Sequence, residues 1–132
     1  MPQIPNLENK LNTLRSRQIP VWMYFQSAEQ IEWQYGRGAI DVFFGSADLK
    51  LFFRLDDDKT RKLVSSLVGT TEKMIYTNSR NGRQNTRTSR KERVNVIEPH
   101  QLGELKDHEV VCLFGGASAI GKATPFFKEK QK

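Results

Sequence analysis

Five consecutive apolar residues, Val21 to Phe25, follow Pro20 in the first quarter of the chain. A run this short, rich in aromatic residues and led by a proline, predicts a strand that is buried on both faces. Strands of this kind belong to mostly parallel sheets that helices cover on both sides. We therefore expect an α/β fold that is organised around this strand.

The predicted strand ends at a polar amide, Gln26, and a helix is expected to begin directly after it. Ser27 is followed three residues later by Gln30, which is the pattern of a capping box at a helix start. In open α/β sheets, ligands bind outside the carboxyl ends of the strands. Gln26 is therefore the first candidate for a functional residue, and the alternative is that it only caps the loop or the helix start.

The remaining sequence alternates between helix patterns and strand patterns. Helices are predicted where apolar residues recur three or four positions apart, and strands where short apolar runs occur. The expected helices begin at or near Asn6, Ser27, Ala39, Asp56–Asp58 and Pro99, and the further expected strands cover residues 49–53, 72–77, 109–114 and 119–127. A chain of 132 residues is one domain at most, so we expect a single α/β domain that ends in an antiparallel hairpin.

The segment from residue 78 to residue 93 contains no apolar side chain, so it cannot contribute to a core and we expect a mobile loop. Between residues 78 and 95, six basic residues stand against one acidic residue, Glu92, in a chain with a formal net charge of +6. Arginines separated by small polar residues suit contacts with a nucleic acid backbone, and the alternative is a surface loop with no ligand. The candidate residues for this contact are Arg80, Arg83, Arg87, Arg90, Lys91 and Arg93.

Residues 116–122, GASAIGK, have the spacing G-x-x-x-x-G-K of a phosphate-binding loop. In such a loop a serine or threonine follows the lysine, and a helix begins there so that its N-terminus faces the phosphates. Here Ala123 follows Lys122, and Pro125 interrupts any helix two residues later. We therefore expect a hairpin turn at this position and not a nucleotide site.

Other kinds of site find little support in the sequence. Cys112 is the single cysteine, which excludes a disulfide within the chain. His100 and His108 have no further ligand at metal-binding spacing, so we expect no metal site. No apolar run approaches the roughly 18 residues that a membrane-spanning helix needs.

The order and spacing of several stretches resemble the C-terminal part of the coupling-protein ATPases of bacterial conjugation and type IV secretion, the TraG/TraD family. The matching stretches are IPNLE (4–8), LRSR (14–17), FQSAEQIEWQYG (25–36), LFFRLDDDKTRKLVSSLVG (51–69), VIEPHQLGEL (96–105) and EVVCLFGG (109–116). The resemblance covers almost the whole chain. It implies an incomplete RecA-like, three-layer α/β fold with a mostly parallel central sheet and a C-terminal antiparallel hairpin.

In that family this region completes the motor domain of a hexameric ATPase, which pumps single-stranded DNA and bound protein towards the secretion channel. Part of the region is described as the recognition site for the relaxosome protein TraM. The resemblance therefore implies a C-terminal module of a DNA-transfer motor. The alternative is a stand-alone basic module that binds nucleic acid or the relaxosome and has no link to ATP.

The resemblance also implies roles for two residues. Gln26 corresponds to the glutamine that senses the terminal phosphate of the nucleotide. Arg15 corresponds to the arginine finger that reaches the ATP of the neighbouring subunit, and Arg17 is the competing candidate for this role. An arginine supplied across an interface stabilises the charge that develops during phosphoryl transfer.

The chain departs from the family because it lacks the phosphate loop and the Asp-Glu pair that hold ATP and magnesium. We therefore expect no cofactor and no ATPase activity in the chain alone, with ATP and magnesium acting only in the complete motor. Sheet strands would then be missing, so an open edge and self-association are expected. The expected partners are the remainder of the motor or further copies of the chain, a TraM-type relaxosome protein and single-stranded DNA. The expected location is the cytoplasm, at the inner face of the cell membrane if the chain is part of the complete secretion complex.

Overall fold

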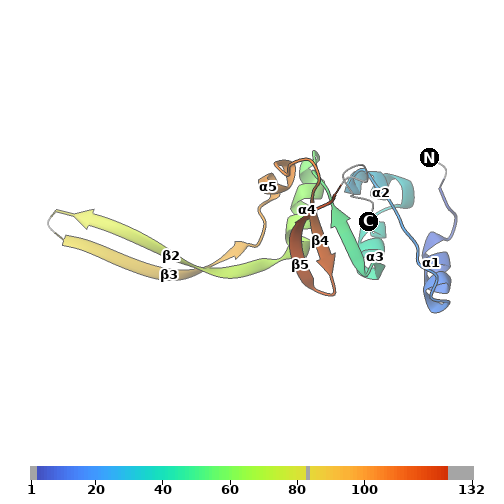
Figure 1. Cartoon of the computed structure of the whole chain (residues 1–132), viewed down its shortest axis with the longest axis horizontal. Helices are drawn as coiled ribbons and strands as arrows, with labels where there is room; N and C mark the ends of the chain where they lie inside the picture. The colour runs from blue at the N-terminus through green and yellow to red at the C-terminus, as the bar shows by residue number, and fades with distance from the viewer. Residues whose placement is uncertain (1–2, 83, 125–132) are drawn as a thin grey trace, which may run out of the picture.

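The structure is a computed structural model that describes residues 3–82 and 84–124. The helices are α1 (Leu7–Ser16), α2 (Ala28–Tyr35), α3 (Ala39–Ser46), α4 (Asp58–Val68) and α5 (Pro99–Gly103). The strands are β1 (Leu49–Phe52), β2 (Thr70–Asn81), β3 (Gln84–Asn95), β4 (Glu109–Phe114) and β5 (Ala117–Lys122). Helices and a small sheet form a compact body, and β2 and β3 project from it as a long ribbon (Figure 1).

Two separate sheets account for the described strands. One has the order β1-β4-β5, and the other is the β2-β3 ribbon. Each pairing is antiparallel, from Leu49 opposite Phe114 to Glu109 opposite Lys122. The expected α/β composition and the C-terminal hairpin are therefore confirmed. The mostly parallel central sheet is not confirmed, because the described strands contain no parallel pair.

The core consists of two adjoining clusters of buried side chains. In the first, α4 and α5 pack against the sheet, with Val64 and Leu102 fully buried and Val111 of β4 nearly so. The second joins α2 to α3 through Ile31 and Phe43, and α1 packs against its edge. Burying one large aliphatic side chain contributes about 1.5–3 kcal/mol. These two clusters therefore fix the body from which the candidate site is built.

The expected strand over residues 21–25 was wrong. The structure has no regular secondary structure between the end of α1 and the start of α2, apart from turns and a bend. Trp22 is 67% exposed and Tyr24 is 83% exposed, whereas both were expected to be buried. A strand requires a neighbouring strand to pair with its backbone groups, and no strand in the described ranges pairs with these residues.

The expected loop over residues 78–93 was also wrong. Apart from Gly82 in the turn, the described residues of this range belong to β2 and β3, which pair in continuous register from Thr70 opposite Asn95 to Asn81 opposite Gln84. At about 3.4 Å per residue, twelve-residue strands give a ribbon of roughly 40 Å. A ribbon needs no apolar run, because cross-strand hydrogen bonds satisfy the inward-facing backbone groups of both strands. The expected strand over residues 72–77 is confirmed as part of β2.

Local signals in the sequence predicted several element ends correctly. Ser27 caps α2 by accepting a hydrogen bond from the Gln30 backbone at 3.2 Å, as the capping pattern indicated. The hairpin between β4 and β5 turns through Gly115 and Gly116, which have positive φ values of 55° and 83°. This places the GASAIGK stretch in a turn and a strand, as expected. In the described part of the chain, no helix has the length and apolar character that crossing a membrane requires.

Candidate functional site

Gln26 lies between α2 and residues 21–25, which we call the exposed segment. Its backbone N–H donates to the Oε1 atom of Gln30 at 3.0 Å, so the residue takes part in the cap of α2. Gln26 as a whole is exposed, and it lines a cavity in the body. The backbone of Gln26 therefore takes part in the helix start, as the capping alternative proposed, through the side chain of Gln30. The side chain of Gln26 is not part of this contact.

A buried hydroxyl fixes the turn that carries Gln26. The backbone N–H of Ala28 donates to the Oγ1 atom of Thr60 at 2.9 Å, and this contact ties the start of α2 to the start of α4. The Thr60 hydroxyl in turn donates to the carboxylate of Asp57, the residue that caps α4. Hydrogen bonds from the Thr60 side chain and backbone hold the pKa of Asp57 below its usual value. The Asp56–Asp58 run predicted the helix start here, but no local pattern signals the link to α2, which joins residues 32 positions apart.

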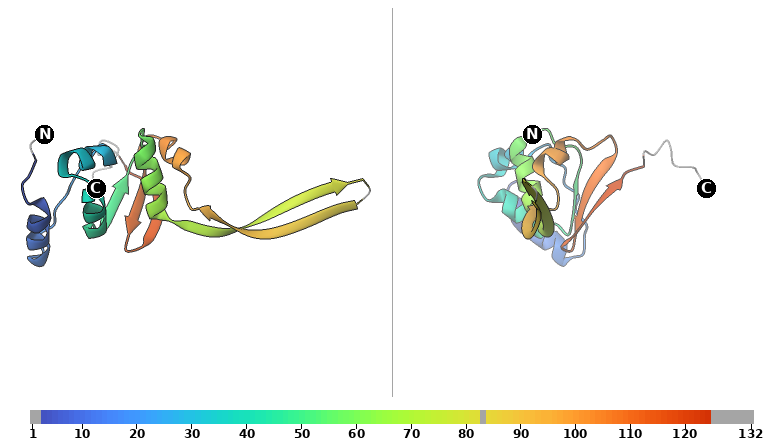
Figure 2. Two further views of the ribbon diagram at one scale, coloured as in Figure 1. Left: turned by 180° about the vertical axis from the view of Figure 1, so that it is seen from behind. Right: turned by 90° about the vertical axis from the view of Figure 1, so that its left-hand side faces the viewer.

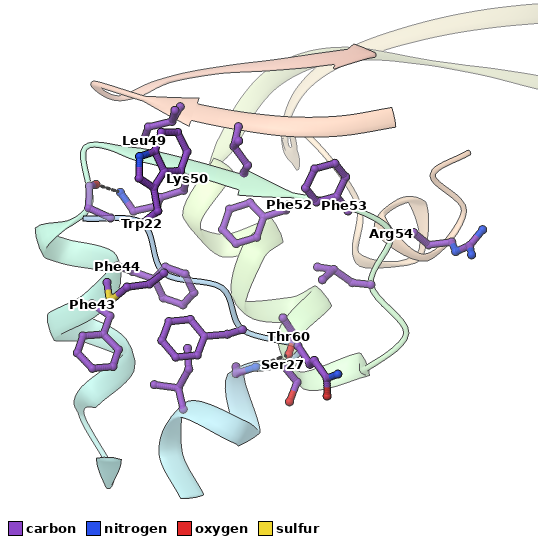
Figure 3. A pocket seen from close by; sticks show the side chains of 18 of the residues that line it. Trp22, Ser27, Phe43, Phe44, Leu49, Lys50, Phe52, Phe53, Arg54 and Thr60 are labelled. Carbon is purple, nitrogen blue, oxygen red and sulfur yellow. Dashed lines mark hydrogen bonds between the residues drawn. The ribbon is translucent and has the colours of Figure 1, made fainter. Parts of the chain in front are cut away.

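The cavity next to Gln26 has a volume of about 670 Å³ and lies between two stretches of chain, residues 21–27 and residues 49–56. We call it the edge cavity. Figure 3 shows aromatic rings from β1 and α3 gathered around it, with Trp22 towards one end and Ser27 and Thr60 towards the other. Its size lies within the range of small-molecule and cofactor pockets, which is about 300–1,000 Å³.

The edge cavity runs along the open side of β1. Successive side chains of a strand point to opposite faces of a sheet. The cavity is lined by every residue from Leu49 to Leu55, so it follows the edge of β1 and not only one face. Among the described strands β1 pairs only with β4, which leaves its other edge open. The open edge of β1 and the unpaired residues 21–23 and Phe25 therefore line one cavity.

Arg15 lies elsewhere on the body. It is in the last turn of α1, with 64% of its side chain exposed, and its Nη2 atom is 3.5 Å from the Oδ1 atom of Asp48. An exposed ion pair of this kind contributes less than about 1 kcal/mol. Arg15 lines a second cavity, whose wall includes Val21 and Trp22, and it does not line the edge cavity. The structure therefore does not bring Arg15 and Gln26 into one pocket. Arg17, the competing candidate, caps the end of α1 and is exposed.

The candidate nucleic-acid-binding residues lie on the ribbon. Arg87, Arg90, Lys91 and Arg93 are exposed residues of β3. For Arg80 only the backbone, in β2, is described, and Arg83 lies outside the described residues. The ribbon projects away from β1, which lines the edge cavity, and from α1, which carries Arg15 (Figure 1). The candidate residues of the ribbon are therefore separate from both Gln26 and Arg15.

Comparison with solved structures supports the fold. The bacterial conjugative coupling protein TrwB, in an unbound ΔN70 form, superposes with a TM-score of 0.71 at 19% sequence identity. The match covers 92% of this chain and 28% of that one, so this chain spans just over a quarter of the TrwB chain. At this level of identity the likeness shows a shared fold. A comparison with curated proteins found no match.

The sequence itself matches a protein family. Residues 1–107 match the family described as the TraM recognition site of TraD and TraG. The match includes α1, the exposed segment, both walls of the edge cavity and the whole ribbon. Because it extends over most of the chain, the protein belongs to the TraG/TraD C-terminal family of conjugative coupling proteins.

Proposed function

We propose that the chain acts as the C-terminal module of a conjugative DNA-transfer motor, and that other polypeptide completes its sheet and its nucleotide pockets. The observation that carries this proposal is the edge cavity. An open strand edge and an unpaired apolar segment face each other there, and Trp22 and Tyr24 of that segment remain largely exposed. Exposed apolar surface of this extent marks a site of association.

A strand inserted into the edge cavity would convert residues 21–25 from an irregular segment into part of a larger sheet. Gln26 would then follow a sheet strand at its carboxyl end, where ligands of open α/β sheets bind. In this proposal Gln26 senses the terminal phosphate of a nucleotide that the added polypeptide holds. Thr60 supports that role by fixing the turn between Gln26 and α2.

Arg15 suits a role across a subunit interface. It is well exposed, its contact with Asp48 is long, and it lies in a different cavity from Gln26. A guanidinium that is held this weakly can turn towards a neighbouring subunit at little cost in free energy. We propose that Arg15 acts as the finger on the ATP of the neighbouring subunit in an oligomer, which is a hexamer in the family. A TraM-type relaxosome protein is the further partner that the family description supports.

Within the described residues, the stretch with phosphate-loop spacing does not have the geometry for ATP. A phosphate loop presents backbone N–H groups at the N-terminus of a helix. Here residues 117–122 form β5, and Lys122 is opposite Glu109 in the sheet. The proposal therefore assigns ATP and magnesium to the complete motor and predicts that the chain alone has no ATPase activity.

The test is an ATPase assay on the full chain mixed with a polypeptide that carries the nucleotide-binding half of a TraG/TraD motor. We expect phosphate release from the mixture and none from the chain alone. Arg15→Ala should lower kcat on the order of 10³-fold, as removal of an arginine finger does, whereas the matched change Arg17→Ala should leave kcat nearly unchanged. Mixing the Arg15→Ala and Gln26→Ala proteins should restore part of the activity, because some interfaces then combine an intact arginine with an intact glutamine.

Two results would contradict this proposal. One is saturable ATP hydrolysis by the chain alone that Lys122→Ala abolishes. The other is equal loss of activity with Arg15→Ala and Arg17→Ala, which would show that these residues act only through the general charge of α1.

The second function that we propose is nucleic acid binding by the β2-β3 ribbon. The observation that favours it is a set of exposed cations on β3, Arg87, Lys91 and Arg93, on an element that projects from the body (Figure 2, left). Phosphate contacts by such cations release counterions, so the binding should weaken steeply as the salt concentration rises.

A further inference from the structure

We infer that only one of the two faces of the ribbon binds nucleic acid, and that its ligand is a single strand. This inference rests on the proposal that the ribbon binds nucleic acid, and it adds the face, the residues and the kind of ligand. The face in question carries Met74, Tyr76, Arg87, Lys91 and Arg93, and we call it the tyrosine face.

The register of the ribbon assigns each side chain to a face. Cross-strand partners share a face, and alternate residues along one strand share a face. Tyr76 is opposite Ser89, and the pairs on either side of it on the same face are Met74 with Lys91 and Asn78 with Arg87. Glu72 with Arg93 extends this face towards the body. The tyrosine face therefore combines three cations with an aromatic ring and a thioether.

The opposite face has a different composition. It carries the pairs Lys73 with Glu92, Ile75 with Arg90 and Thr77 with Thr88, and we call it the Glu92 face. The Nη2 atom of Arg90 is 3.2 Å from the Oε2 atom of Glu92, so a nearby carboxylate balances this cation. On the tyrosine face the corresponding contact, between Lys91 Nζ and Glu72 Oε2, is longer at 3.9 Å. Arg87 and Arg93 make no ion pair on the described part of that face.

Tyr76 gives the tyrosine face a surface on which a base can stack. The guanidinium carbon of Arg87 lies 4.5 Å from the centroid of the Tyr76 ring, in a cation–π contact. The residue is still 55% exposed, and neighbouring Met74 is 45% exposed. Aromatic rings and guanidinium planes are the groups on which unpaired bases stack.

The combination of stacking groups with cations distinguishes between the two forms of DNA. In a duplex the flat faces of the bases are covered by neighbouring base pairs, so a surface ring on the ribbon gains no stacking contact. A single strand offers both phosphates and uncovered bases, and the tyrosine face offers a partner for each. The ribbon extends beyond the body in Figure 1 and in the left view of Figure 2, so both faces of its distal part are open and the choice between them is chemical.

The experiment measures fluorescence anisotropy of a labelled oligothymidylate of about 20 nucleotides with the full chain, a length that exceeds typical site sizes on single strands. The two variants to compare are Arg87→Ser with Lys91→Ser, on the tyrosine face, and Lys73→Ser with Arg90→Ser, on the Glu92 face. Each removes two positive charges from the same ribbon. We expect Kd to rise at least about tenfold for the variant on the tyrosine face and little for the variant on the Glu92 face. For the variant on the tyrosine face, the slope of log K against log salt concentration should fall in magnitude by about 1.4.

A second pair of variants tests the stacking role without changing the charge. Tyr76→Ser should raise Kd for the oligothymidylate by about tenfold, in the range for loss of one stacked base, whereas Tyr76→Phe should retain binding. Neither change should affect binding to a duplex of the same length. Circular dichroism should show the same strand content in every variant.

The possible failures are distinguishable. Equal loss with both charge variants would overturn the assignment to one face while the ribbon remains a nucleic acid site. Two results would overturn the claim that the ligand is a single strand. One is tighter binding to the duplex than to the oligothymidylate, and the other is competition by polyglutamate that equals competition by unlabelled oligothymidylate. No binding by the unmodified chain would overturn both this inference and the proposal on which it rests.

Discussion

Thr60 shows how one side chain can fix the helix start that follows a candidate functional residue, Gln26. It is 5% exposed, and its hydroxyl both accepts from the Ala28 backbone and donates to Asp57. The caps of α2 and α4 are therefore connected through a single atom. Neither cap requires this connection, because Ser27 and Asp57 each accept from the backbone of their own helix. The connection instead sets where α2 begins relative to α4.

Replacing Thr60 with valine should destabilise the protein by about 1–3 kcal/mol, because the buried Ala28 N–H would lose its partner and the shape of the side chain would hardly change. Urea unfolding followed by circular dichroism measures this. Ser66→Ala is the matched control, because Ser66 is on the same helix and its hydroxyl donates to the Lys62 backbone carbonyl, but it is exposed. Equal effects of the two changes would show that the link between α2 and α4 adds nothing to stability.

At the scale of elements, the ribbon contributes surface but little interior. The two core clusters draw on α2 to α5 and the β1-β4-β5 sheet, and none of the residues from 72 to 93 whose side chains the structure describes belongs to either of them. Isolated two-stranded ribbons are marginally stable in water, so this one depends on its attachment at the base. There Val96 donates to the carbonyl of Gly69 at 3.0 Å, next to the buried Ile97.

Excision of the ribbon should therefore leave the body folded. Thr71 and Val94 are directly opposite each other, so residues 72–93 can be replaced by a two-residue Asn-Gly turn that closes a short hairpin. We expect the excision to cost no more than about 1 kcal/mol, because the ribbon contributes little to the core. A loss of this size corresponds to a fall in Tm of roughly 2–8 °C in a domain of this size. Thermal unfolding of the two proteins measures this. A large fall in Tm would show that the ribbon stabilises the core.

At the scale of the whole molecule, the edge cavity and the exposed segment beside it leave large apolar side chains uncovered. Leu49, Leu51 and Phe53 on β1 or next to it are each more than 40% exposed, as are Val21 and Trp22 across the cavity. Open strand edges and exposed apolar segments promote association between chains. This exposed apolar surface is what the proposed association with other polypeptide would cover.

The unmodified chain should self-associate as its concentration rises. The double change Trp22→Ser with Tyr24→Ser should reduce this association, because it removes two large apolar groups from the exposed segment. Trp33→Ser is the control, since Trp33 is 86% exposed on α2 and does not line the edge cavity. Size-exclusion chromatography with light scattering measures the mass. A clean monomer of the unmodified chain at high concentration would contradict the prediction.

Local sequence was sufficient to determine the helix starts and the final hairpin. Ser27 with Gln30, and Asp57 with Thr60, interact over three residues, so their pattern can be recognised without knowing the rest of the fold. The turn at Gly115 and Gly116 is equally local. The resemblance to the TraG/TraD family came from the order of such stretches, and the family match confirms it.

Tertiary structure decided the two strand assignments that the sequence pattern predicted wrongly. Residues 21–25 have a strong strand pattern and no partner among the described strands, whereas residues 84–95 have a weak pattern and a partner at every position. Strand formation depends on hydrogen bonds to residues distant in the sequence, so composition cannot decide it. The sequence was sufficient to identify Gln26 and the ribbon cations as candidates. Strand pairing leaves the edge of β1 open beside Gln26, and the register of the ribbon assigns its cations to two faces. Neither can be read from the sequence, because both depend on which strands pair.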